Sequence, residues 1–331
     1  MGLELEALIG DNNFIRVRDL LRANFHLKLE FCNPAGSIEF KTAIGLIRSC
    51  EAAGLIKKNA VLVETSSGSL GVALAMVCAE RGYRFKCVID PLTSAQDAQA
   101  MRALGTDIIC VAKMDACHGY LEARREYVRD LVGRDARYVW VSQHDNQASP
   151  DVHAELTAAA IAHRFSRVDY LFVSAATKGM LMGCARYFSR SRPETKIVAV
   201  DSVGTFTLDG EPRFISGVGA PHQPGFIEGR PVYAAVSVPE VAAVLSCRYL
   251  ARSYGVLAGG STGSVMTAVL SWRVKFHPGE VVVAIAPDTG EQYLETIYND
   301  QWVIARFGDD ALLPERYVGF LEECVTDCRA E

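Results

Sequence analysis

Short apolar runs alternate with segments of helical periodicity along most of this chain, beginning at residue 61. The runs expected to form strands in the first half are Val61–Glu64, Arg84–Asp90, Asp107–Val111 and Tyr138–Ser142. The helices expected between them are Leu70–Arg81, Ala95–Leu104 and Tyr120–Val132. Strands that are joined through helices form right-handed βαβ units on a parallel sheet. The alternation therefore predicts an α/β fold in which helices flank parallel sheets.

A second series of the same kind follows in the C-terminal half. Its expected strands are Tyr170–Val173, Ile197–Asp201 and Val281–Ala286, and its expected helices are Val238–Tyr254 and Thr262–Lys275. A chain of 331 residues is long for a single core, because hydrophobic cores usually stop growing at about 250–300 residues. Two α/β domains are therefore expected.

The composition favours a globular, cytoplasmic protein that binds neither nucleic acid nor membranes. The net charge is −5, which disfavours general binding to nucleic acid or to anionic lipid. The start of the chain lacks the basic and apolar regions of a signal peptide, and no apolar run approaches the roughly 20 residues of a transmembrane helix. The ten cysteines are scattered, which predicts free thiols and no metal site.

The stretch Asn33–Lys41 opens an amphipathic run of helical spacing, Thr42–Ala53. Pro34 and Gly36 interrupt regular structure, and Ser37 is a residue type that caps helices. A loop that leads into a helix presents free backbone N–H groups and the positive end of the helix dipole. The stretch is therefore a candidate binding site for an anion.

The same stretch resembles the active-site segment of the cysteine synthase and cystathionine beta-synthase family, which are pyridoxal-phosphate (PLP) enzymes of fold type II. The family's pattern is Asn-Pro-Gly-Gly-Ser-(Val/Ile/Met)-Lys-Asp-Arg, and its lysine forms a Schiff base with the cofactor. Here Glu39 stands at the lysine position, and a carboxylate cannot form an imine. The resemblance implies a tryptophan synthase beta-like architecture, with a smaller domain at 38–142 and a larger one that combines 1–37 with 143–331.

Further loops resemble the parts of the family that bind the substrate. The loop after the strand at Val61–Glu64 matches the pattern (Ser/Thr)-(Ser/Thr)-Ser-Gly-Asn-(Leu/Thr)-Gly, with Ser69 at the position of the Asn. Small hydroxyl residues and glycines at the start of a helix also offer N–H and O–H donors to a carboxylate. The substrate-binding residues implied by the resemblance are Thr65, Ser66, Ser67, Gly68, Gln143 and Gly217.

Two loops in the C-terminal half resemble the family's cofactor site. The loop at 176–183 aligns with the Gly-rich phosphate cradle, although Met180 replaces its last hydroxyl donor. Asp288 stands where cysteine synthases usually carry Ser near the pyridine nitrogen; a carboxylate there favours a protonated pyridine, and Asp is also an ordinary turn residue. The cofactor-binding residues implied are Ser69, Thr177, Lys178, Gly179 and Asp288.

Three other segments resemble one branch of the family, the synthases that join O-phosphoserine and glutamate on the way to 2,3-diaminopropionate for siderophores. They are Asp115–Leu121, Ala258–Ser264 and Tyr298–Trp302. The whole resemblance runs from about Ile9 to Trp302. It implies a lyase or transferase of amino-acid biosynthesis that acts on an O-phosphoserine- or O-acetylserine-like substrate, and it implies a homodimer.

Glu39 leaves three functions open. The first is a divergent β-replacement enzyme in which Glu39 is the base. The second is a non-catalytic homologue that binds an amino acid as a sensor or partner subunit. The third is a PLP-independent lyase in which Glu39 is the acid or base. No other lysine is an evident substitute for the family's lysine. Lys41 lies about 200° round the helix from Glu39, Lys28 lies on an expected strand, and Lys178 belongs to the loop that resembles the phosphate cradle.

Overall fold

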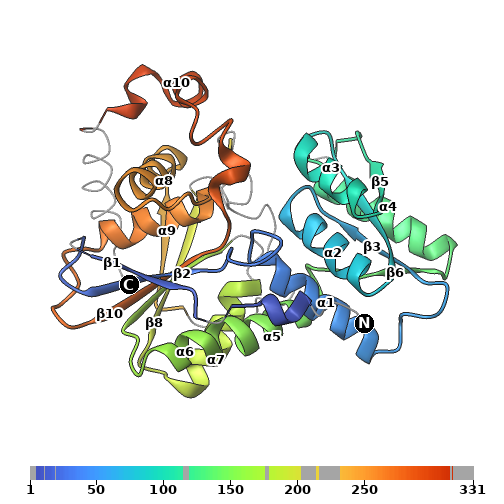
Figure 1. Cartoon of the computed structure of the whole chain (residues 1–331), viewed down its shortest axis with the longest axis horizontal. Coiled ribbons are helices and arrows are strands. Elements are labelled where there is room, and N and C mark those ends of the chain that lie inside the picture. Colours follow the sequence, from blue (N-terminus) through green and yellow to red (C-terminus); the bar gives the residue numbers. More distant parts are fainter. Residues whose placement is uncertain are drawn as a thin grey trace. The chain divides into compact units, whose positions relative to one another are not determined.

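The computed structural model describes residues 5–10, 12–18, 20–114, 119–175, 179–202, 214–215, 232–313 and 315. The contacts between Cα atoms divide the chain into two compact units. Unit 1 comprises Met1–Gly10 and Asn33–Val152, and unit 2 comprises Asp11–Cys32 and His153–Glu331. Figure 1 shows the course of the chain through both units. The predicted smaller domain, 38–142, falls inside unit 1.

Unit 1 is built on a four-stranded parallel sheet in the order β5-β4-β3-β6. Its strands are β3 (Val61–Thr65), β4 (Arg84–Ile89), β5 (Asp107–Cys110) and β6 (Tyr138–Trp140). Its helices are the 3-10 helix η1 (Leu5–Leu8), α1 (Glu39–Ala52), α2 (Ser69–Glu80), α3 (Ala95–Ala103), α4 (Leu121–Arg134) and α5 (Ala148–Val152).

Apolar residues cover both faces of this sheet, as expected for parallel strands. The main cluster joins α1, α2 and α3 to one face and includes Phe40, Ile44, Leu62, Leu74, Phe85 and Met101. A smaller cluster joins α4 to the other face through Val63, Val88 and Val128. Because successive side chains of a strand point to opposite faces, the neighbours Leu62 and Val63 serve different clusters.

Unit 2 contains a six-stranded sheet in the order β1-β2-β10-β7-β8-β9. The pair β1–β2 is antiparallel, and the other neighbouring strands are parallel. The strands are β1 (Phe14–Val17), β2 (Asn24–Leu29), β7 (Tyr170–Ser174), β8 (Lys196–Ser202), β9 (Ala234–Val238) and β10 (Val281–Ala286). The core includes Phe25, Phe172, Val236, Val265, Met266, Trp272 and Val282.

The helices of unit 2 follow the strands along the chain (Figure 1). They are the π-helix η2 (His153–Ala158), α6 (Ala159–Arg164), α7 (Gly179–Ser191), α8 (Glu240–Tyr254), α9 (Gly260–Ser271), the 3-10 helix η3 (Gly290–Tyr293), α10 (Asp300–Phe307) and the 3-10 helix η4 (Asp309–Leu312). Helices α8 and α9 contribute Ala242, Ala243, Val265 and Val269 to the core beside the sheet. The predicted α/β fold with parallel sheets flanked by helices is confirmed.

The loop before α1 is organised by Asn33 and not by Ser37. The Asn33 Oδ1 atom accepts a hydrogen bond from the Ala35 backbone N–H at 3.0 Å, and its Nδ2 donates to the Ser37 carbonyl at 2.8 Å. Ile38 is the N-cap of α1 and makes no side-chain cap bond. The Ser37 hydroxyl is buried and bonds to nothing in the part of the chain that the structure describes. The helix therefore begins at Glu39, three residues before the predicted start.

None of the described helices is both long enough and apolar enough to span a lipid bilayer.

Candidate functional site

The carboxyl ends of β3 and β6 in unit 1 are tied together by one buried carboxylate, that of Glu64. It accepts hydrogen bonds from the Thr65 backbone N–H at 2.7 Å, the Gln143 backbone N–H at 2.8 Å and the Trp140 indole N–H at 3.0 Å. Burial raises the pKa of Glu64, and these donors oppose that rise. Since open α/β sheets bind ligands at the carboxyl ends of their strands, this carboxylate shapes a candidate site.

Thr65, Ser66 and Gln143, three of the predicted substrate-binding residues, lie together at this edge of the sheet. The Ser66 hydroxyl accepts from the Gly71 N–H at 2.9 Å and so satisfies a donor in the first turn of α2. The Gln143 Nε2 atom donates to the Thr65 carbonyl at 2.8 Å. The Thr65 side chain is different, because its hydroxyl is buried and has no partner among the described residues.

The remaining residues of this loop lead into α2. Ser67 is exposed, Gly68 is the N-cap, and Ser69 is the first helical residue. Gly71 allows α2 to approach α3 and β4 closely, because a Cβ there would lie 2.8 Å from the Met101 sulfur of α3 and 3.2 Å from the Cys87 sulfur of β4. The loop thus combines the N-terminus of a twelve-residue helix with a buried, unsatisfied hydroxyl. Both features suit the carboxylate of a ligand.

Glu39 is the first residue of α1, a helix whose N-cap supplies no side-chain hydrogen bond. A carboxylate is stabilised at this end by the helix dipole. Lys41 lies on the same helix and is only 2% exposed. With 3.6 residues per turn, two positions separate side chains by about 200°, so Lys41 projects from a different side of α1.

Unit 2 carries a second buried carboxylate, Asp288, in the loop that follows β10. The Tyr293 hydroxyl donates to Asp288 Oδ2 at 2.6 Å, and the Gly259 N–H donates to the Asp288 carbonyl at 3.0 Å. The Oδ1 atom is buried and accepts no hydrogen bond from the residues that the structure describes. Burial raises the pKa of Asp288 to about 6.

The wall beside Asp288 is built by close backbone approaches. A Cβ on Gly259 would lie only 2.2 Å from Asp288 Oδ2, so the carboxyl group rests against the Gly259 backbone. The Tyr298 hydroxyl donates to the Ala258 carbonyl at 2.7 Å and accepts from the Ala258 N–H at 3.0 Å. The Cys247 thiol donates to the Gly259 carbonyl at 3.2 Å. Asp288 therefore lies in a preformed cradle.

The structure describes only some of the other residues predicted at the binding sites. Gly179 begins α7, whereas Thr177, Lys178 and Gly217 lie outside the described residues. Lys28 on β2 is fully buried, lies 3.4 Å from Glu30 in an ion pair, and packs over the Phe14 ring. Its neighbours on the strand, Phe25 and Leu27, face the core shared with α8 and α9. Lys28 therefore projects from the opposite face of the sheet.

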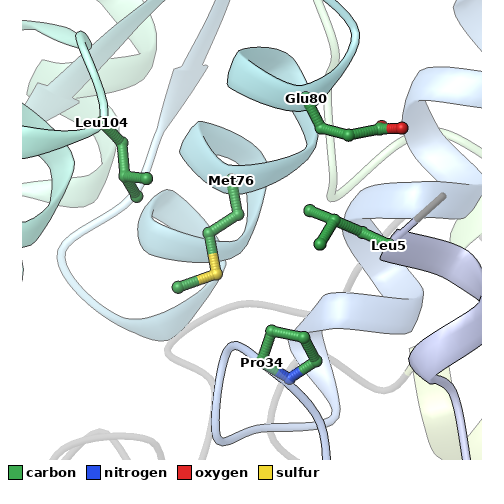
Figure 2. A pocket seen from close by; sticks show the side chains of 5 residues that line it. All are labelled: Leu5, Pro34, Met76, Glu80 and Leu104. Atoms are coloured by element: carbon green, nitrogen blue, oxygen red, sulfur yellow. The ribbon is translucent and has the colours of Figure 1, made fainter. Parts of the chain in front are cut away.

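A pocket of about 440 Å³ lies within unit 1, and its lining includes none of the residues predicted to bind the substrate or the cofactor. It is lined by Leu5, Pro34, Met76, Glu80 and Leu104. Figure 2 shows the apolar side chains around the hollow, whereas the Glu80 carboxylate points away from Met76 and Leu104. An amino acid needs converging polar groups to fix its orientation. This pocket does not supply them.

Two α/β units with polar loops at the carboxyl ends of parallel strands define the class of PLP fold type II proteins. The model of the pyridoxal-phosphate dependent enzyme family matches residues 5–288, and the chain belongs to this family. It is 34% identical to N-(2-amino-2-carboxyethyl)-L-glutamate synthase of Ralstonia nicotianae, over 93% of this chain and 94% of that protein.

Two solved structures show the same fold. O-ureido-L-serine synthase is 30% identical, with a TM-score of 0.83 over 93% of this chain and 98% of that one. A lysine-to-alanine variant of the same synthase, bound to O-ureido-L-serine, is also 30% identical and gives a TM-score of 0.80 over 88% and 92% of the two chains. The chain is thus homologous to PLP-dependent β-replacement enzymes.

The sequence analysis assigned no role to Glu64, Trp140 or Tyr293. Glu64 and Tyr293 form the hydrogen bonds that fix the loops containing Thr65 and Asp288. A sequence signal existed for Glu64, because an acidic residue that ends an apolar strand and precedes a ligand loop is rarely left without partners. For Trp140 and Tyr293 no local pattern indicated the partner.

Proposed function

We propose that this chain binds the carboxylate of an α-amino acid at the Thr65 loop of unit 1 and binds PLP at unit 2 without covalent attachment. In this proposal it acts on a β-substituted amino acid of the O-phosphoserine or O-acetylserine type. The observation that carries the proposal is the Thr65 hydroxyl, which is buried in a ligand loop and has no partner in the described structure.

The polar groups around Thr65 support this assignment. Ser66 and Gln143 are held by hydrogen bonds within unit 1, so the loop is rigid before a ligand arrives. A buried hydroxyl without a partner costs stability, and a bound carboxylate would remove that cost. The N-terminus of α2 adds free N–H groups and a favourable dipole. A carboxylate is therefore the ligand group that this loop suits best.

The residues at Asp288 fit the pyridine end of PLP. The unpaired Oδ1 atom offers an acceptor for a ring nitrogen that carries a proton, and the missing Cβ of Gly259 leaves the backbone close beside the carboxyl group. When bound, PLP supplies an electron sink for the Cα of an amino acid. Asp288 would hold the ring nitrogen, and Gly179 at the start of α7 would offer a helix N-terminus to the phosphate.

Glu39 has the chemistry of an acid or base and not of a covalent anchor. In the proposal its carboxylate attracts the ammonium group of the substrate and takes the proton from the substrate Cα. The lysine-to-alanine variant of O-ureido-L-serine synthase, which is bound to O-ureido-L-serine, supports the view that a related chain lacking one lysine still holds an amino acid.

Calorimetry with serine, O-phosphoserine and succinate tests the proposal. Both amino acids should bind more tightly than succinate, because Glu39 attracts an ammonium group and repels a second carboxylate. Thr65→Val should weaken amino-acid binding by about 10- to 150-fold, the equivalent of one charge-assisted hydrogen bond. Ser189→Ala is the control, since Ser189 is an exposed hydroxyl residue near the end of α7, outside both binding loops.

Four results would contradict parts of the proposal. Equal binding of succinate and serine, or unchanged affinity in Glu39→Gln, would remove the role of Glu39. Unchanged affinity in Thr65→Val would remove the carboxylate site. Tight binding of O-phosphoserine with no exchange of its phosphate for a nucleophile, in the presence of PLP, would assign a sensor in place of an enzyme.

A further inference from the structure

The Asp288 carboxylate is buried in unit 2 with no cation to balance it among the described residues. Asp288 is 9% exposed, the Tyr293 hydroxyl is bonded to it, and its charge acts in turn on Cys247 and Tyr298. Burial raises the pKa values of the Cys247 thiol and the Tyr298 hydroxyl, so both are neutral near pH 7. A buried charge without a partner is costly.

Arg248 does not supply the missing charge. Arg248, on α8, donates to the Ile297 carbonyl at 2.9 Å and is paired with Asp300. Its charge lowers the pKa of Tyr298, and it is not among the groups that shift the pKa of Asp288. No cation of the described residues is among the groups that shift the pKa of Asp288.

Tyr293 is the one described side chain that donates a hydrogen bond to the Asp288 carboxyl group. It lies in η3, directly after Asp288 and Thr289. The turn is pressed against the preceding loop, because a Cβ on Gly290 would lie 2.8 Å from the Ala258 nitrogen. This packing fixes the Tyr293 hydroxyl at 2.6 Å from Oδ2 and leaves Oδ1 unpaired.

We propose that Tyr293 is a positioning residue that keeps Asp288 ionised, with Oδ2 occupied and Oδ1 reserved for the N–H of a protonated nitrogen heterocycle. The inference rests on the proposed function, in which that heterocycle is the pyridine ring of PLP. A phenol that donates to a carboxylate stabilises the charged form. Without this donor, Asp288 is protonated near neutral pH and presents a proton to the ring nitrogen instead of accepting one.

The role of Tyr293 is testable in the protein alone. The carboxyl carbon of Asp288 is followed by NMR in protein labelled with ¹³C-aspartate, and the signal is assigned by its loss in Asp288→Asn. In the wild-type protein the titration midpoint should lie near pH 6. Tyr293→Phe should raise the midpoint by about one to two pH units.

Two variants separate this role from a purely structural one. Tyr298→Phe is the matched control: it removes a buried phenol that bonds to the Ala258 backbone and not to Asp288, and it should leave the midpoint within half a unit or so. Incorporation of 3-fluorotyrosine at Tyr293 keeps the ring and strengthens the donor, so it should lower the midpoint. An unchanged midpoint in both Tyr293 variants, or an equal rise in Tyr298→Phe, would overturn the inference.

The protonation of the ligand is read separately with ¹⁵N-labelled PLP added to the protein. The ring-nitrogen signal should be that of a protonated pyridine in the wild-type protein and of an unprotonated pyridine in Tyr293→Phe. PLP that binds with an unprotonated ring in the wild-type protein would overturn this inference and leave the proposed function intact. Failure of PLP to bind would instead contradict the proposed function, and the carboxyl titration would still decide the role of Tyr293.

Discussion

Asp288 should make the folded chain less stable as the pH rises. Burial raises its pKa from 3.8 to about 6, so the folded state holds the proton more strongly than the unfolded state does. Ionisation therefore costs folding stability above pH 6, by about 3 kcal/mol, and costs none below about pH 4. Asp288→Asn should be more stable than the wild-type protein at pH 8, and the difference should shrink toward pH 4.5. Urea unfolding at both pH values measures it; a difference independent of pH would contradict it.

Glu64 should be essential to the Thr65 loop. Glu64→Ala leaves the N–H groups of Thr65, Gln143 and Trp140 without their acceptor, and each buried unsatisfied donor costs about 1–3 kcal/mol. We expect a loss of at least about 3 kcal/mol in urea unfolding. Glu64→Gln should cost less, because one amide oxygen can still accept from Thr65 and Trp140, which both bond to Oε1.

Glu126→Ala on α4 is the control for Glu64, since Glu126 is exposed. It should change the free energy of unfolding by no more than about 0.5 kcal/mol. A similar loss in Glu126→Ala and Glu64→Ala would mean that the buried hydrogen bonds of Glu64 contribute nothing specific.

At the scale of elements, helices α8 and α9 pack so closely that Gly263 has no room for a side chain. A Cβ there would lie 2.1 Å from the Ala243 carbonyl oxygen and 2.6 Å from the Cys247 sulfur. Gly263→Ala should destabilise the chain by about 1–3 kcal/mol or more, because the backbone of α8 must shift. Gly133, near the end of α4, has open space at the same position, and Gly133→Ala should stabilise by about 0.4–1 kcal/mol. Thermal unfolding of the pair compares them directly.

Elements with a clear hydrophobic period were predictable from the sequence, and elements fixed by long-range contacts were not. The predicted strand Val281–Ala286 coincides with β10. In contrast, β9 (Ala234–Val238) is short and rich in small residues, and only its pairing with β8 makes it a strand. Helix α7 was not predicted, because its start at Gly179 had been assigned to the loop at 176–183 that resembles the phosphate cradle.

One boundary differs for a reason of backbone geometry. The strand predicted at Tyr138–Ser142 ends at Trp140, and Ser142 has a φ of 59°, in the left-handed region that residues other than glycine rarely adopt. The turn brings the Gln143 N–H onto Glu64. No local pattern predicts such a conformation for Ser, because tertiary hydrogen bonds impose it.

Local motifs indicated which residues of the candidate site lie close together, and the role of these residues stays a prediction. Thr65, Ser66 and Gln143 do lie together in unit 1. No sequence pattern indicated that Ser66 and Gln143 form internal hydrogen bonds, or that Glu64 supports both loops. These bonds join residues up to 79 positions apart. Only a folded chain reveals them.

For the whole molecule, the absence of an amine at Glu39 predicts that PLP is bound reversibly. PLP added to the purified protein should be removed by dialysis, and borohydride should leave no cofactor on the chain. Mass spectrometry of the reduced protein measures this. A cofactor adduct that survives dialysis and maps to a lysine peptide would contradict the prediction, and Lys178 is the first residue to examine.

We further propose that the chain forms a homodimer, as the resemblance to the cysteine synthase family implies. Light scattering after size-exclusion chromatography should give twice the chain mass of 36.1 kDa. A mass of 36.1 kDa that does not change with concentration would contradict it.

The start of α1, which has no side-chain cap, also determines what a lysine at its first position would do. Glu39→Lys would place an ammonium group at the positive end of a helix, which forfeits a favourable interaction and adds an unfavourable one, at about 0.3–1 kcal/mol each. The same field would lower the pKa of the new amine and leave more of it uncharged near neutral pH. An uncharged amine is the nucleophilic form. The helix N-terminus thus stabilises the present carboxylate, and it would make an introduced lysine more reactive as a nucleophile.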